Sequence, residues 1–293
     1  MDFSDKKNYK IYVSISNFET DEDKLEFEDF IILKIHQGSE AKKYREILGC
    51  KKNPRHILIK HFKNYEIIDS YITGFEGINN ILGNLLLIFR LFKPGDIIFG
   101  DNLIEDLDDT SRYSNVYSLD KFSIFKYSFQ EDEIGKFENF KKKIIKKPGF
   151  NNRLYNFSFY YFQLGISRGF ANRLEYLNRI VDYFTALESI FILDSERNQK
   201  TRILKNRIKN FLEEDSASEI IEKFYDIRGR IVHGDFVFKE KSELEAKIER
   251  IKNELHFFEE LVRKIYIRLL DYKFKEKKEL EIFLNDLYVM LDN

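Results

Sequence analysis

No proline follows Pro148, so about half of the chain lacks the residue that most effectively interrupts a helix. In this half, apolar residues recur three and four positions apart, which is typical of helices that bury one face. The spacing predicts helices over 174–191, 201–212, 218–233, 243–271 and 278–291. Short connections between such helices favour an all-α, up-and-down helical bundle.

The residues before Pro148 follow a different pattern. Alternating and β-branched segments predict strands over 11–16, 27–35, 56–62, 96–99 and 117–129, and helical spacing predicts one helix over 77–92. We therefore expect a mixed α+β N-terminal domain over residues 1–147, followed by the helical bundle over residues 151–293. The lysine-rich segment between them, 141–149, ends in Pro148 and Gly149 and is interpreted as a solvated linker.

The charge balance excludes one way of attracting nucleic acid. The 293 residues include 49 Lys and Arg against 50 Asp and Glu, which gives a formal net charge of -1. Overall charge therefore cannot draw RNA to the protein, and any contact with RNA must come from a local patch.

Cysteine and hydropathy patterns indicate a cytoplasmic protein. Cys50 is the only cysteine, which excludes an intramolecular disulfide and a cysteine-based zinc site and is typical of a reducing compartment. The N-terminus lacks the apolar core of a signal peptide, and the longest apolar stretch, 81–89, is too short to span a bilayer. The histidines show no metal-binding spacing, and no Walker or Rossmann glycine pattern is present, so we expect no metal and no cofactor.

The segment 224–234, FYDIRGRIVHG, carries the most informative pair of residues. Arg228 is followed after four residues by His233, and Gly234 is placed to end the helix. An imidazole exchanges protons near neutral pH, and an arginine fork binds the charge of a phosphate bidentately. On an ideal helix the two side chains stand about 140° apart, so joint action on one phosphate requires a loosened helix end or a second subunit.

The segment YDIRGRIVHG resembles the signature of HEPN domains, and it is most similar to the Apea-like HEPN group. In that group a helix similar to IVDYFTALES, residues 180–189, precedes the motif, and a helix similar to LVRKI, residues 261–265, follows it. The three segments occur here in the same order, and the resemblance covers residues 151–272.

The resemblance implies a metal-independent endoribonuclease, in which the 2′-hydroxyl of RNA attacks the adjacent phosphate and leaves a 2′,3′-cyclic phosphate and a 5′-hydroxyl. His233 would be the general acid/base, and Arg228 would bind the phosphate in the transition state, with Arg230 as a supporting residue of the motif. The resemblance also implies a homodimer through the bundle and a role in bacterial antiviral defence or as a toxin. The N-terminal domain would then act as a sensor or regulator.

Two residues depart from the family pattern. Catalytic HEPN members usually have a polar residue directly after the arginine, where this chain has Gly229. Members that pair with a nucleotidyltransferase antitoxin tend to have a tyrosine two residues after the histidine, where this chain has Asp235. Gly229 favours an alternative, in which the HEPN bundle binds RNA or a protein partner without cutting.

Further charged residues are candidates for supporting roles. Glu188 lies in an apolar helical stripe, where it either orients Arg228 or His233 or forms a buried ion pair with an arginine such as Arg202 or Arg263. A basic run extends from Arg197 to Lys209 without an acidic residue. Three of its members, Arg202, Lys205 and Lys209, share one helical face that could follow an RNA backbone.

A rival motif, Gly165-Ile166-Ser167-Arg168-Gly169, matches the G-x-S-x-G nucleophile elbow of hydrolases and follows a strand-like segment. The hydrolase fold requires several strands after the elbow, whereas the residues downstream of Ser167 are predicted to be helical. The sequence therefore favours the HEPN-like interpretation over the hydrolase.

Overall fold

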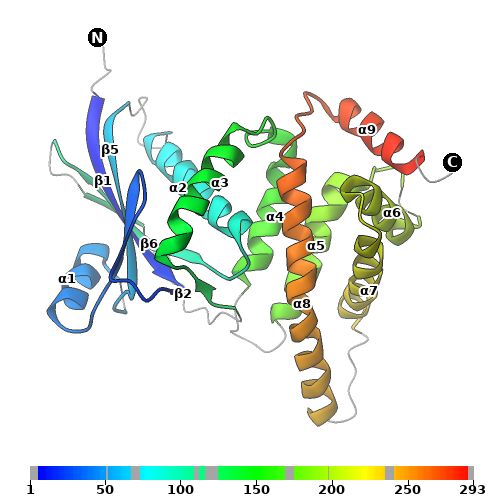
Figure 1. Ribbon diagram of the computed structural model, residues 1–293, viewed down its shortest axis with the longest axis horizontal. Helices are drawn as coiled ribbons and strands as arrows, with labels where there is room; N and C mark the ends of the chain where they lie inside the picture. The colour runs from blue at the N-terminus through cyan, green and yellow to red at the C-terminus, as the bar shows by residue number, and fades with distance from the viewer. Residues whose placement is uncertain are drawn as a thin grey trace. The chain divides into compact units, whose positions relative to one another are not determined.

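The chain divides into two compact units, Met1–Lys142 and Lys143–Asn293, each with its own buried core. The computed structural model describes residues 6–50, 52–66, 73–108, 112–115, 125–168, 175–196, 198–234 and 241–289. Figure 1 shows strands and helices in the first unit and helices in the second. The protein is thus a mixed α+β chain with a helical C-terminal part.

A six-stranded antiparallel sheet forms the centre of the first unit. The strands lie in the order β3 (Lys24–Glu26), β4 (Phe30–Lys34), β5 (His56–Glu66), β1 (Lys6–Ser16), β6 (Ile98–Asp106) and β7 (Arg112–Asn115). Two short strands, β2 (Phe18–Glu19) and β8 (Tyr127–Ser128), pair in parallel beside it.

Helices cover both faces of this sheet, which explains why the middle of β1 is apolar at almost every position (Figure 1). Tyr12 is paired with Ile59 and packs in the core beneath α1 (Ser39–Leu48). On the opposite face the ring of Phe30 contacts Phe89 of α2 (Thr73–Phe92) and Phe137 of α3 (Ile134–Lys146). Alternate residues of each strand therefore enter two different apolar layers.

The sequence predicted the central elements of this unit and missed peripheral ones. The strands predicted over 11–16 and 56–62 and the helix predicted over 77–92 lie within β1, β5 and α2. The segment 27–35 forms a shorter strand, β4, and the strand predicted at 96–99 begins at Ile98 and runs on to Asp106. Of the strand predicted over 117–129, only Tyr127–Ser128 is observed, and residues 117–124 lie outside the described residues. Helices α1 and α3 and strands β2, β3 and β7 were not predicted.

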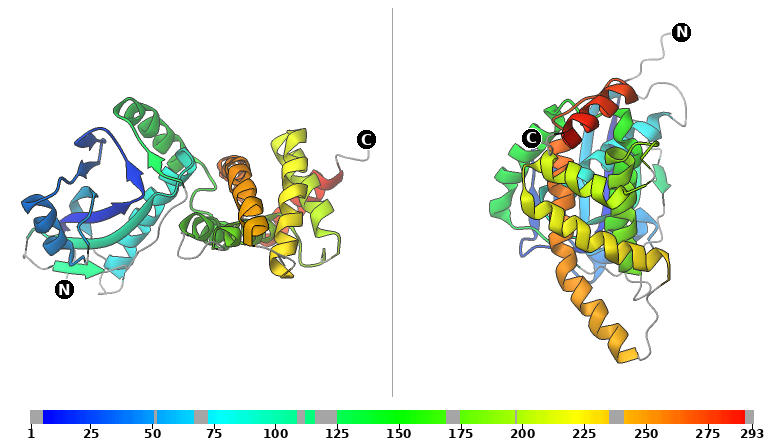
Figure 2. Two further views of the ribbon diagram at one scale, coloured as in Figure 1. Left: turned by 90° about the horizontal axis from the view of Figure 1, so that it is seen from below. Right: turned by 90° about the vertical axis from the view of Figure 1, so that its right-hand side faces the viewer.

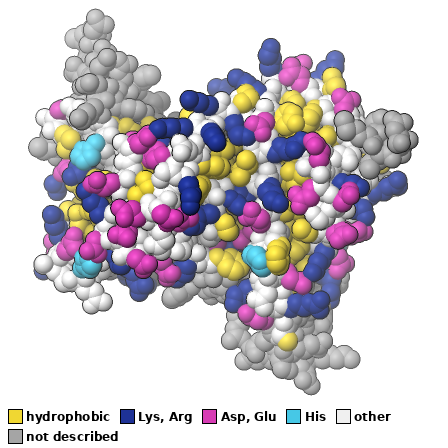
Figure 3. Space-filling view, viewed as in Figure 1, with side chains coloured by type: hydrophobic (Ala, Val, Ile, Leu, Met, Phe, Trp, Pro, Cys, Tyr) yellow, Lys and Arg dark blue, Asp and Glu magenta, His cyan; other side chains and the backbone are white. Residues whose placement is uncertain are grey.

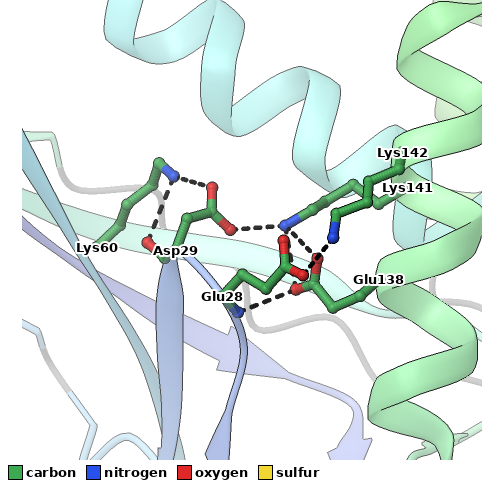
Figure 4. Close-up of polar contacts among 6 residues, drawn as sticks. All are labelled: Glu28, Asp29, Lys60, Glu138, Lys141 and Lys142. Carbon is green, nitrogen blue, oxygen red and sulfur yellow. Dashed lines mark hydrogen bonds and ion pairs between the residues drawn. The ribbon is translucent and has the colours of Figure 1, made fainter.

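The interpretation of the lysine-rich segment as a solvated linker is wrong. Residues up to Lys146 continue helix α3, and Lys141 is buried. The Lys141 ammonium lies 2.6 Å from the carboxylate of Asp29 and 2.8 Å from that of Glu138, and Lys60 pairs with the same Asp29 (Figure 4). The segment is helical because Phe137, Ile144 and the aliphatic part of Lys141 pack inward while most of the other lysines face solvent.

The second unit is built from six α-helices within the described residues, as the absence of proline predicted. They are α4 (Asn156–Ser167), α5 (Glu175–Phe191), α6 (Lys200–Leu212), α7 (Asp215–Val232), α8 (Lys241–Leu269) and α9 (Lys277–Val289). Helix α5 packs against α4 and α7, and α6 packs against α7 and α9. The right-hand view of Figure 2 shows α6, α7 and α8 packed together.

Two buried arginines connect these helices in place of apolar side chains. The Arg207 guanidinium on α6 binds both carboxylate oxygens of Glu196, at 2.6 and 2.7 Å, and donates to the carbonyl oxygen of Leu284 on α9. Arg179 on α5 binds Glu259 on α8 at 3.1 Å. Because these charges are paired and hydrogen-bonded, they are accommodated in the core. Among the described helices, none is both long enough and apolar enough to cross a membrane.

Candidate functional site around Arg228 and His233

Helix α7 and its C-cap carry the two residues of the motif. Arg228 lies on its last turns, and His233 follows Val232, the last residue of the helix. The His233 backbone N–H still donates to the carbonyl oxygen of Gly229, at 3.0 Å. Gly234 then takes a φ of 74°, which confirms the predicted glycine cap.

His233 lies on the surface, five residues beyond Arg228. Five residues of helix correspond to about 7.5 Å along the axis. Arg230, the supporting residue of the motif, lies half-buried on the same turn.

The Arg228 guanidinium is partly buried, with 24% of the side chain exposed. Its Nη2 atom lies 3.7 Å from Glu188 Oε1, which is ion-pair distance but beyond a hydrogen bond. Its Cζ atom lies 5.5 Å from the centre of the Tyr225 ring. Its Nε atom is buried and has no hydrogen-bond partner among the described residues.

Glu188 reaches this site from α5 and is held there by two donors. The Tyr225 hydroxyl donates to its Oε1 at 3.0 Å, and the Lys200 ammonium donates to its Oε2 at 3.1 Å. The predicted proximity of Glu188 to Arg228 is therefore observed. The predicted ion pair with Arg202 or Arg263 is not, because Arg263 pairs with Glu260 and Arg202 lies exposed on α6.

Tyr225 and Lys200 are the site residues that the sequence did not identify. Burial, reinforced by the neighbouring Glu188 carboxylate, raises the pKa of Tyr225 to about 12. The hydroxyl is therefore protonated near neutral pH and remains a donor. Spacing on α7 gives a signal for Tyr225, which stands three residues before Arg228 and thus on a neighbouring part of the helix face.

The three residues of the predicted RNA-binding face lie on α6 and differ in their contacts. Lys205 pairs with Glu222 at 2.9 Å, and Lys209 pairs with Asp215 at 2.7 Å. Arg202 is exposed. The remainder of the basic run is divided, since Arg207 is buried in the core and Arg197 lies outside the described residues, as does Asp235.

The nucleophile-elbow interpretation of Ser167 is wrong. The strand-like segment before it is helix α4, and the Ser167 hydroxyl donates to the carbonyl oxygen of Gln163, one turn earlier, at 2.8 Å. An elbow requires a strand before the serine and a turn that presents it, and Ser167 instead ends a helix. Gly169 lies outside the described residues.

Within the described part of the chain, no group of three or more His, Cys, Asp or Glu side chains is placed to hold a metal ion. Comparisons with protein-family models, with curated proteins and with solved structures find no match to this chain.

Proposed function

We propose that the protein is a cytoplasmic, metal-independent endoribonuclease of the HEPN type, and that its C-terminal unit is an up-and-down HEPN bundle. The RNA 2′-hydroxyl attacks the adjacent phosphorus, and the bond to the 5′-oxygen of the next nucleotide breaks. The products are a 2′,3′-cyclic phosphate and a 5′-hydroxyl. His233 transfers the proton, and Arg228 binds the phosphate as negative charge develops on it.

The state of Arg228 is the observation that carries this proposal. Arginines in a helical core normally have their donors satisfied, as Arg207 does here. Arg228 is three-quarters buried, yet its Nε has no hydrogen-bond partner among the described residues and its Nη2 lies 3.7 Å from Glu188, beyond a hydrogen bond. A partly buried guanidinium with open donors suits an anionic ligand, and a phosphate oxygen pair matches its fork.

The reaction requires a base for the 2′-hydroxyl and an acid for the leaving oxygen. A homodimer through the bundle would supply two copies of His233, one for each proton transfer. Local patches, with Arg202 as the exposed member of the α6 face, would contact RNA. Figure 3 supports a local rather than a global attraction, because acidic and basic side chains are interspersed on the face it shows.

A second candidate function is a HEPN bundle that binds RNA or a protein without cutting. Gly229 favours it, because this position offers no side chain to support a reacting group beside Arg228. Under either function the N-terminal unit would act as a sensor or regulator, in antiviral defence or in a toxin.

Cleavage of RNA by the purified protein separates the two candidates. We expect wild-type protein to release 2′,3′-cyclic phosphate and 5′-hydroxyl ends, and Arg228→Ala and His233→Ala each to lower the rate at least about a hundredfold. Arg153→Ala and His256→Ala are matched controls, because both residues are exposed in the same unit and outside the site. Equal cleavage by all five proteins would remove the catalytic assignment, and binding without cleavage would favour the second candidate. Growth on expression of the same variants tests the toxin role.

A further inference from the structure

The carboxylate of Glu188 lies at ion-pair distance from Arg228 but forms no hydrogen bond with it. A free glutamate beside an arginine usually forms two parallel hydrogen bonds of about 2.8 Å, which would occupy the donors that a phosphate needs. Here the nearest separation, from Arg228 Nη2 to Glu188 Oε1, is 3.7 Å. Something therefore holds the two groups apart.

Two donors occupy the carboxylate, one on each oxygen. Tyr225 binds Oε1 at 3.0 Å, and Lys200 binds Oε2 at 3.1 Å. The two donors come from different helices, α7 and α6, so together they fix the orientation of Glu188 on α5. The charge of Lys200 also offsets the attraction between Glu188 and Arg228.

A second Tyr–Glu–Arg arrangement in the same unit shows an arginine that does bind its glutamate. Tyr183 donates to Glu259 Oε1 at 3.0 Å, and Arg179 donates to the same oxygen at 3.1 Å. Arg179 is fully buried and also donates hydrogen bonds to the carbonyl oxygen of Arg168. Arg179 therefore binds Glu259 although Tyr183 donates to the same oxygen, so a tyrosine hydroxyl alone does not keep an arginine and a glutamate apart.

We infer that Tyr225 and Lys200 are positioning residues, which hold the Glu188 carboxylate away from Arg228 and so keep the guanidinium open to a phosphate group of RNA. The inference rests on the proposed function for its ligand, but the positioning itself is a property of the folded protein. Without the hydrogen bonds from Tyr225 and Lys200, the Glu188 carboxylate would form hydrogen bonds with the Arg228 guanidinium.

The coupling between Arg228 and Glu188 tests the positioning without any activity. We would measure urea unfolding for Arg228→Gln, Glu188→Gln and the pair of substitutions, first in the wild-type background and then in Tyr225→Phe/Lys200→Met. The coupling in the unfolding equilibrium constant is expected to rise about tenfold in the second background. An equal coupling in both backgrounds would overturn the inference. Lys200→Met alone provides the comparison if the double substitution does not fold, because Lys200 is the donor that the Tyr183–Glu259–Arg179 arrangement does not show.

Binding and cleavage test the consequence for RNA. Tyr225→Phe/Lys200→Met is expected to weaken binding of a 2′-O-methyl RNA oligonucleotide, which cannot be cleaved, and to slow cleavage of RNA about tenfold. Adding Glu188→Gln is expected to restore both, because a neutral amide attracts Arg228 less. A merely structural defect would not be rescued by a third substitution in the same cluster.

Tyr183→Phe is the matched control, because it also removes a tyrosine hydroxyl from a glutamate and lies outside the site. It is expected to leave RNA binding unchanged. Failure of Glu188→Gln to rescue would overturn the inference. A raised coupling in a protein that cleaves no RNA would instead overturn the proposed function and leave the positioning intact.

Discussion

At the scale of single residues, the same side-chain type takes opposite roles in this protein. Arg179 and Arg207 are buried with their donors bound to carboxylates and carbonyl oxygens. Arg228 lies beside a carboxylate that is already bound by other donors. The number of satisfied donors, more than the depth of burial, separates the structural arginines from the candidate functional one.

His56 gives the first unit a dependence on pH. Its ring is buried at the start of β5 against Phe18, and burial, followed by the nearby Lys34 and Arg55 charges, lowers its pKa from 6.5 to about 4. The unfolded chain therefore binds the proton more readily than the folded protein between these values. The His56 contribution is fully present above about pH 6.5 and is lost as the pH falls toward 4.

Over this interval the loss of unfolding free energy from His56 is about 3 kcal/mol. His56→Gln removes the titration, so its stability is expected to vary less with pH than that of the wild type. Urea unfolding at pH 7 and pH 4.5 measures the difference. The same pH dependence in both proteins would contradict the assignment.

At the scale of helices and strands, regular spacing of apolar residues determined what could be predicted. Helices α5 to α9 show this spacing clearly, and they formed near the predicted positions. Helix α1 buries only two of its described residues, Ala41 and Leu48. Helix α3 buries a lysine, Lys141, whose partner Asp29 is distant in the sequence. Regular apolar spacing therefore does not predict either helix. The motif on α7 could be recognised because its residues are close together in the sequence. The contact of Lys200 with Glu188 could not, because it depends on how α5 and α6 pack.

Gly229 is expected to tolerate a methyl group. A Cβ at this position of α7 would meet no atom within 4 Å, and the glycine is not in the left-handed region. Gly229→Ala should raise the free energy of unfolding by about 0.5–1 kcal/mol, because alanine loses less conformational entropy in a helix. Gly234→Ala is the control of opposite sign, since its φ of 74° is costly for alanine. Urea unfolding of both variants tests the pair, and a destabilised Gly229→Ala would contradict it.

Gly165 permits the close approach of α4 to α5. A Cβ there would lie 2.6 Å from Cε1 of the Tyr183 ring, which is itself held by the hydrogen bond to Glu259. Gly165→Ala is expected to lower the free energy of unfolding by about 1–3 kcal/mol. Gly83→Ala on α2 is the control, because a Cβ there would meet no atom within 4 Å, and it should not lower the free energy of unfolding. Thermal unfolding distinguishes the two, and equal melting temperatures would show that α4 and α5 can separate without cost.

At the scale of the whole molecule, two separate polar clusters stabilise the two units. Lys141 joins Asp29 and Glu138 in the first unit, and Arg207 joins Glu196 in the second (Figure 4 shows the former). Removing Lys141 or Arg207 leaves a largely buried carboxylate, Glu138 or Glu196, without this cation.

Substitution of these residues is therefore expected to act locally. Lys141→Met should raise hydrogen exchange in β4 and β5, and Arg207→Met should raise it in α6 and α9, each by about tenfold or more. Mass spectrometry of exchanged peptides locates the change. Equal increases in both units from either substitution would show that they unfold as one.

The open donors of Arg228 also bear on how the protein is handled. A guanidinium that binds a phosphodiester also binds other tetrahedral oxyanions. Sulfate or inorganic phosphate in a buffer would therefore occupy the same position. Under the proposed function, these salts are therefore expected to inhibit RNA cleavage competitively at ionic strengths where chloride has little effect. Phosphate-buffered saline would therefore lower the measured rate of the proposed RNA cleavage.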